Sequence, residues 1–221
     1  LIATKGYAAS EVGNAFNRAW ELCQQLGNPP QLVPVLTILT AFYEMRAEYQ
    51  KARQLGEICL NLAQNTGNTD LLLEANFNCG LILYFSGEFT ESLKYNKQAI
   101  ALYDPKQHSS HAFIYGHDPG VGAMSQAVEN IWFLGYHVLS QEELNDQIRL
   151  TKELSHPYNT AYALIFSCCH NHLCRDWQAT QESAEEGIAL CIEHGFPLFL
   201  AQSILFRGVA LAKQGQANEE L

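Results

Sequence analysis

The sequence predicts an all-α fold made of about five stacked helical pairs. Short stretches of sequence recur at a step of 40 residues, which is typical of repeat proteins. Apolar residues recur every three or four positions, as they do along one face of a helix. No stretch sustains the alternation of apolar and polar residues that indicates a strand. A single helical pair cannot bury its own apolar face, so we expect the pairs to stack and to share one continuous core.

The 40-residue step is clearest at turns and at one position of the helices. Leu26-Gly27-Asn28-Pro29 is followed 40 residues later by Thr66-Gly67-Asn68-Thr69. A second series has steps of 48, 40 and 40 residues and consists of Gly80, Val128, Cys168 and Gly208. The one longer step predicts an insertion of about eight residues between Gln107 and Gly120.

Each repeat is expected to begin with one helix, to turn sharply and to end with a second helix. Leu32, Leu36 and Leu39 form the apolar stripe of one such first helix. In the next repeat the turn is Ser86-Gly87-Glu88, and its second helix begins at Phe89. Glycine is favoured where a helix ends and the backbone becomes left-handed. Three glycines occupy such positions: Gly87, Gly135 and Gly215.

Composition and charge exclude several classes of protein. Of the 221 residues, 48% are apolar and 16% are charged, which is enough to build a core and excludes a wholly disordered chain. There are 13 lysines and arginines against 23 acidic residues, a net charge of −10, so we expect neither a nucleic-acid surface nor binding to an anionic membrane. No apolar run is long enough to span a bilayer, and no signal peptide is recognisable. The seven cysteines lie in apolar helical patterns, so we expect reduced thiols in a cytoplasmic protein.

The glycine, aromatic and alanine pattern resembles the tetratricopeptide repeat. The residues that carry the resemblance are Gly80, Leu83, Gly87, Phe89 and Ala99 in one repeat, and Gly208, Leu211 and Gly215 in the last. The 40-residue spacing resembles the long-helix type found in the maltose-regulon activator and in bacterial nucleotide cyclases and kinases that carry an ATPase module. The resemblance implies a right-handed superhelix of α-α hairpins and one repeat domain over residues 1–221.

The stretch from Tyr103 to Tyr136 is similar to the C-terminal repeat region of those multidomain cyclases. The chain begins at Leu1, without an initiator methionine, and its last residues, 216–221, resemble the first turn of a further helix. We therefore expect the sequence to be a fragment of a longer multidomain protein.

In the tetratricopeptide architecture, the first helix of each pair lines the concave side. The resemblance therefore implies a concave groove that is rich in aromatic rings and poor in positive charge. Its expected binding residues are Glu74, Phe77, Tyr84, Phe85, Glu129, Trp132, Phe133, Tyr162 and His172. Such a surface favours an apolar or amphipathic peptide or a partner domain, and other domains of the parent chain are included. The alternative for each ring is packing against the neighbouring repeat.

These features predict a non-catalytic interaction scaffold, which would serve as a regulatory arm for signal transduction in a cyclase- or kinase-like ATPase protein. The alternative is a small-ligand sensor, in which Trp132 and Tyr84 stack on a sugar or metabolite and Glu74 and Glu129 accept its hydroxyl hydrogen bonds. A deep pocket bounded by the insertion would favour the sensor. No phosphate-binding loop, nucleophile elbow or HExxH motif occurs, so we expect no enzyme and no cofactor.

Two clusters contain residue types that bind metals. In the run from Cys168 to Cys174, consecutive helical residues point in diverging directions, so we expect core packing of the cysteines and no zinc site. The inserted segment gathers His108, His111, His117 and Asp118. These side chains suit a metal or proton-transfer site, but Asp118-Pro119-Gly120 indicates a turn into the next helix. We therefore expect a shaped loop that caps or narrows the groove.

Overall fold

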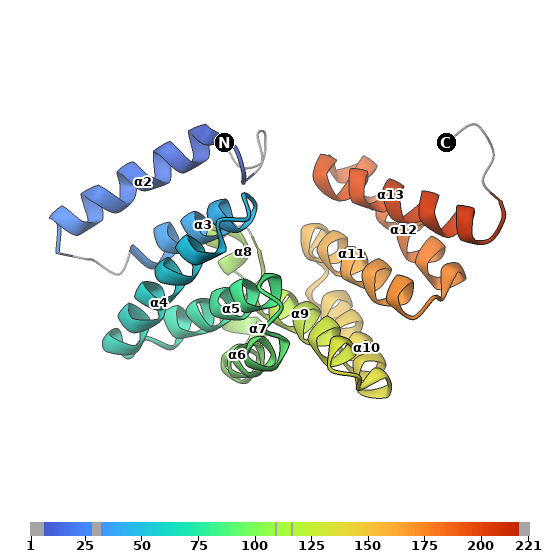
Figure 1. Ribbon diagram of the computed structural model, residues 1–221, viewed down its shortest axis with the longest axis horizontal. Coiled ribbons are helices and arrows are strands. Elements are labelled where there is room, and N and C mark those ends of the chain that lie inside the picture. Colours follow the sequence, from blue (N-terminus) through green and yellow to red (C-terminus); the bar gives the residue numbers. More distant parts are fainter. Residues whose placement is uncertain (1–6, 28–31, 109, 116, 217–221) are drawn as a thin grey trace. The chain divides into compact units, whose positions relative to one another are not determined.

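The computed structural model describes residues 7–27, 32–108, 110–115 and 117–216, and all regular structure in these ranges is helical (Figure 1). The expected all-α fold of repeated hairpins is confirmed. Asn28, Pro29 and the expected further helix turn from residue 217 onward lie outside the described residues. None of the helices described combines the length and apolar character that a bilayer crossing requires.

Four helical hairpins follow one another along the chain. They pair α3 (Leu32–Glu44) with α4 (Tyr49–Thr66), α5 (Thr69–Phe85) with α6 (Phe89–Leu102), α9 (Pro119–Phe133) with α10 (His137–Leu154), and α11 (Pro157–Leu173) with α12 (Trp177–His194). Single helices flank them, α2 (Ser10–Gln25) before and α13 (Pro197–Lys213) after. The predicted insertion forms two short helices, α7 (Pro105–His108) and α8 (His111–Tyr115).

The turn inside each hairpin has a residue with positive φ, between 57° and 90°, at a fixed place in the repeat. These residues follow steps of 40, 48, 40 and 40: Ala47, Gly87, Gly135, Arg175 and Gly215. The turns between hairpins show the same step, from Gly27 to Gly67 and from Ser155 to Gly195. The repeat length and the single longer step are therefore confirmed.

Helix starts follow from local side chains. The Asn68 side chain accepts hydrogen bonds from the backbone amides of Asp70 and Leu71 at 2.8 and 3.1 Å, which satisfies two free donors at the start of α5. Asp176 caps α12 in the same way by accepting from the Ala179 amide at 3.0 Å. Helices α11 and α13 begin with proline, whose fixed φ suits the first helical position.

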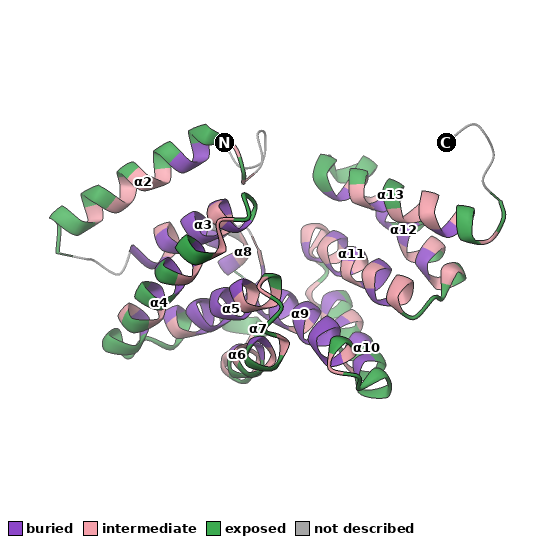
Figure 2. Cartoon of the chain, viewed as in Figure 1, coloured by how far each residue is buried: buried purple, intermediate pink, exposed green. Residues whose placement is uncertain are grey.

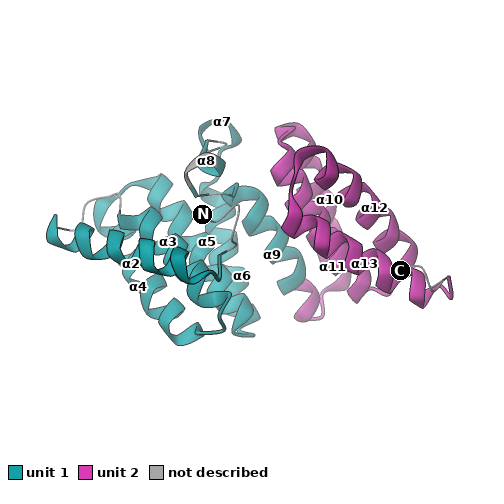
Figure 3. Cartoon of the chain, turned by 90° about the horizontal axis from the view of Figure 1, so that it is seen from above, with its two compact units in different colours: residues 1–130 teal, residues 131–221 magenta. Residues whose placement is uncertain are grey.

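The chain divides into two compact units, residues 1–130 and 131–221 (Figure 3). In unit 1 the first-helix stripe of α3 is buried as predicted, with Leu36 and Leu39 fully buried against α4 and α5 (Figure 2). A second cluster in unit 1 joins Leu73 and Phe77 of α5 to Ala99 of α6 and Ala123 of α9. These clusters set the inner helices α3, α5 and α9 beside one another.

Unit 2 has its own apolar core. Ala161 and Ile165 of α11 pack with Cys191 of α12 and Phe199 of α13. Partly buried rings surround this cluster, among them Tyr158 and Tyr162. The core is thus made by three consecutive helices of the repeat.

Candidate functional site

The inserted segment of unit 1 is fastened to α5 through one carboxylate. Glu74 is fully buried, and both of its oxygens have imidazole partners from the insertion. His111 donates from Nδ1 to Oε1 at 2.6 Å, and His117 Nε2 lies 3.2 Å from Oε2. Burial would raise the pKa of Glu74, but the hydrogen bonds from the two histidines lower it below its ordinary value. Burial opposes protonation of His111, but Glu74 raises its pKa.

The other polar groups of the insertion also have partners within the protein. The Asp104 amide donates to Nδ1 of His108, so the neutral ring carries its proton on Nε2, which lies 3.2 Å from an Asp70 oxygen. Asp118 accepts from the Tyr103 hydroxyl at 3.0 Å and from the backbone amide of Gly120 at 3.0 Å. These contacts favour the interpretation of a shaped, packed segment over a site for chemistry.

The insertion covers two of the side chains expected to line the groove. Glu74 is inaccessible, and Phe77 is 3% exposed. The Phe77 ring lies 4.7 Å from the His117 ring and packs over Gly122 of α9, where a Cβ would come within 2.6 Å of it. The expectation that Glu74 and Phe77 face an open groove is therefore wrong, because the insertion and α9 occupy the space in front of them.

The remaining predicted residues of unit 1 behave differently from one another. Glu129 is 3% exposed and accepts a hydrogen bond from the Tyr84 hydroxyl, so it too does not face an open groove. Tyr84 is half-buried and packs edge-on against Phe85 at 5.2 Å. Phe85, at the end of α5, is 41% exposed. It is the predicted unit 1 residue that reaches solvent most fully.

In unit 2 the predicted residues separate into core and surface. Tyr162 is half-buried and its ring lies 4.9 Å from the Phe166 ring. His172 is half-buried and packs edge-on against Trp177 at 5.4 Å. For Tyr162 and His172 the packing alternative thus has direct support.

At the end of α9, the two remaining predicted rings lie next to each other. Trp132 is half-buried, and its ring meets those of Phe133 and His137 at 5.3 and 5.2 Å. Phe133 is 42% exposed. Phe133 is 48 residues after Phe85 and occupies the same place at the end of an inner helix.

Sequence reasoning missed Glu44, which occupies the same place in its repeat as Tyr84, Trp132 and His172. Glu44 is 4% exposed, and neither of its carboxyl oxygens has a hydrogen-bond partner. Burial raises the pKa of Glu44 well above its ordinary value, which favours the neutral acid. The apolar neighbours in the sequence could have indicated its burial.

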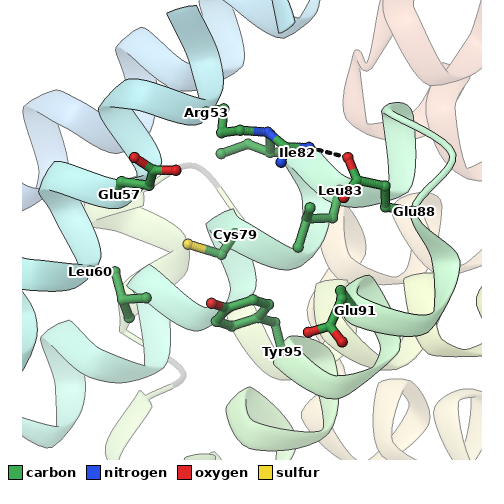
Figure 4. Close-up of a pocket in the computed structure, with 9 residues that line it drawn as sticks. All are labelled: Arg53, Glu57, Leu60, Cys79, Ile82, Leu83, Glu88, Glu91 and Tyr95. Atoms are coloured by element: carbon green, nitrogen blue, oxygen red, sulfur yellow. Dashed lines mark hydrogen bonds and ion pairs between the residues drawn. The ribbon is translucent and has the colours of Figure 1, made fainter. Parts of the chain in front are cut away.

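Sequence reasoning also missed a pocket of about 220 Å³ in unit 1, between α4, α5 and α6 (Figure 4). Its lining residues are Arg53, Glu57, Leu60, Cys79, Ile82, Leu83, Glu88, Glu91 and Tyr95. An ion pair between Arg53 and Glu88 spans its rim, as the dashed line in Figure 4 shows. None of the predicted binding residues lines it. The signal for this pocket lies in helix packing between repeats, which a single sequence does not display.

The cysteines of α11 pack as small apolar residues. Cys168 is fully buried, and its thiol lies 3.8 Å from the Thr180 carbonyl oxygen of α12. Burial raises the pKa of the Cys168 thiol to about 12, so the thiol stays protonated at neutral pH. His170 Nε2 lies 3.6 Å from the Cys174 sulfur. Among the described residues, no three histidine, cysteine or acidic side chains are grouped so as to hold a metal ion.

Two solved structures resemble this chain in fold. BtubC (BKLC) from P. vanneervenii superposes with a TM-score of 0.67 at 15% identity, over 93% of this chain and 84% of that one. The apo form of RapI superposes with a TM-score of 0.61 at 12% identity, over 92% of this chain and 76% of that one. No family model and no curated protein matches the sequence. At such low identity the likeness shows a common fold of repeated helical hairpins.

Proposed function

We propose that this chain is a tetratricopeptide-like, non-catalytic scaffold that binds a peptide or partner domain through aromatic side chains at the ends of its inner helices. The observation that carries the proposal is the exposure of Phe85 and Phe133, at 41% and 42%, in the same place in two hairpins. Large aromatic rings contribute most to stability when buried, and exposed rings at protein surfaces are the side chains that most often anchor partners.

The expected partner segment is apolar or amphipathic, because the exposed groups are rings and the chain carries a net charge of −10. By its sequence resemblance, the scaffold would act in the cytoplasm as a regulatory arm of a cyclase- or kinase-like ATPase protein. Sequencing the gene on both sides of this segment tests that placement, since an ATPase or cyclase domain is expected in the same reading frame.

The function is tested with peptides selected from a random phage-displayed library against the immobilised chain. Isothermal titration then compares the wild type with the double variant Phe85→Ala/Phe133→Ala. We expect at least tenfold weaker binding, which corresponds to about 1.4 kcal/mol. Leu198→Ala, at a side chain that is 58% exposed on α13, is the matched control and should bind as the wild type does. Unchanged affinity in the double variant would contradict the proposal.

Small-ligand sensing is the second candidate, and the pocket in unit 1 is the observation that favours it. Its volume of about 220 Å³ is below the roughly 300–1,000 Å³ usual for ligand sites. Any ligand would therefore be small, and Tyr95, Glu57 and Glu91 would meet it in place of the predicted residues. A thermal-shift screen with monosaccharides tests this function: a shift that Glu91→Gln removes would favour it over peptide binding.

A further inference from the structure

Three apolar side chains at the start of α10 are open to solvent. Tyr136 is 59% exposed, Val138 is 75% exposed and Leu139 is 52% exposed. We call these three residues the α10 patch. The same helix buries Ser140, Leu144, Gln147 and Thr151. At its first turn, α10 thus exposes apolar side chains beside a buried serine, and packing within unit 2 gives no reason for that choice.

The other hairpins show what these positions normally hold. The equivalent residues at the start of the second helix are Glu48, Gln50 and Lys51 in α4, Glu88, Thr90 and Glu91 in α6, and Asp176, Gln178 and Ala179 in α12. All except the alanine are polar. The repeat therefore tolerates polar residues here, and the apolar residues of the α10 patch are specific to this hairpin.

The α10 patch also replaces a stabilising local interaction. Asp176, at the place equivalent to Tyr136, accepts a hydrogen bond from the Ala179 amide and so caps α12. Tyr136 occupies the N-cap of α10 and makes no side-chain capping bond. Loss of such a cap costs about 1 kcal/mol. An exposed ring in place of a cap favours a role outside the fold of unit 2.

Charges around the α10 patch indicate which partner fits it. Between Phe133 and Ile148 the chain has three acidic residues, Glu142, Glu143 and Asp146, and no lysine or arginine. Glu142 is one helical turn after Val138 and Leu139, so its carboxylate lies on the same face of α10. An apolar surface edged by carboxylates is complementary to an apolar segment edged by basic side chains.

We propose that the α10 patch docks a helical segment of a partner protein in which apolar side chains are flanked by lysine or arginine. This inference rests on the proposed scaffold function and names the class of partner. The partner's apolar residues would cover Val138 and Leu139, its basic residues would face Glu142 and Glu143, and Tyr136 would pack on the edge of the contact.

The test uses a synthetic amphipathic helix with leucines along one face and lysines beside them, and a twin with glutamates in place of the lysines. Fluorescence anisotropy compares the wild type with Tyr136→Ser/Val138→Gln/Leu139→Gln, which removes apolar surface without changing charge. We expect the lysine peptide to bind the wild type and to lose at least tenfold affinity with this variant. Binding should weaken with salt, and Glu142→Gln should reduce that dependence.

Ile192→Thr is the matched control, because Ile192 is 67% exposed on α12 and lies outside the α10 patch. It should leave the affinity unchanged, and circular dichroism should show equal helix content in all variants. Equal binding by the triple variant, or by the glutamate twin, would overturn the inference. A dimer of the wild type that the triple variant abolishes would overturn it as well, by assigning the patch to a second copy. If library-selected peptides still bind the triple variant, the scaffold function stands without the α10 patch.

Discussion

The contact between Glu74 and His111 makes the stability of unit 1 depend on pH. The pKa of His111 is raised, so the folded protein holds this proton more tightly than the unfolded chain. The contribution is complete below the ordinary histidine pKa of about 6.5 and is lost as pH rises through the raised pKa. The pKa of Glu74 is lowered, so its contribution is present above about 4.3 and is lost as pH falls through the lowered pKa.

Replacing His111 by alanine is expected to destabilise the fold by about 3 kcal/mol at pH 6, because it leaves a buried carboxylate with one partner fewer. The loss should be smaller at pH 9, where the histidine proton is already absent from the wild type. Urea unfolding at both pH values measures the difference. His111→Gln retains a hydrogen-bond donor without the charge and should fall between. A loss that is equal at the two pH values would contradict the assigned charge state.

At residue scale, the sequence identified the right residues but not their partners. His111 and His117 were singled out as a cluster, and Glu74 was assigned to a different role in the groove. Helical phase shows that Glu74 points to the inner side of its helix. It does not show that a histidine 37 residues later covers that side. Such long-range contacts depend on the path of the insertion, which has no periodic pattern.

At the scale of elements, the hairpin turns offer a direct test of the repeat. Ala47 has a φ of 57°, at the place that glycine takes in three other hairpins. A left-handed conformation costs a residue with a side chain about 1–2 kcal/mol, so Ala47→Gly should stabilise the protein by about 1 kcal/mol. Thermal unfolding checks this. Gly135→Ala at φ 90° is the reverse control and should destabilise by a similar amount.

The sequence predicted the hairpin turns well because each depends on local residues at a fixed step. Gly87 and Gly135 lie in left-handed turns, as expected. The helical character of α7 and α8 was not predicted. Helices of four and five residues are too short to show an apolar stripe or to be stable alone, so packing on α3 and α5 must stabilise them.

At the scale of the whole molecule, the two units have separate cores. Leu36 belongs to the core of unit 1 and Ile165 to that of unit 2. Because a repeat protein is stabilised mainly by neighbouring contacts, we expect each unit to open without the other. Leu36→Ala should cost about 3 kcal/mol and speed hydrogen exchange in α3, α4 and α5. Exchange in α11, α12 and α13 should stay at the wild-type rate, and Ile165→Ala should show the converse.

Equal loss of protection in both units with either variant would show one cooperative fold. The sequence alone did not predict this division, because the 40-residue step continues on both sides of residue 130. Repetition shows that hairpins are alike. It contains no information on how strongly each neighbouring pair is coupled.

The link between α6 and α9 has a consequence for how such proteins diversify. Links of two residues join α4 to α5, α10 to α11 and α12 to α13, whereas residues 103–118 join α6 to α9. Those additional residues change the lining of the inner helices while the spacing of the hairpins on either side stays the same. Lengthening a single linker in evolution, or in the laboratory, can therefore give an old array a new interior without altering any of its helices.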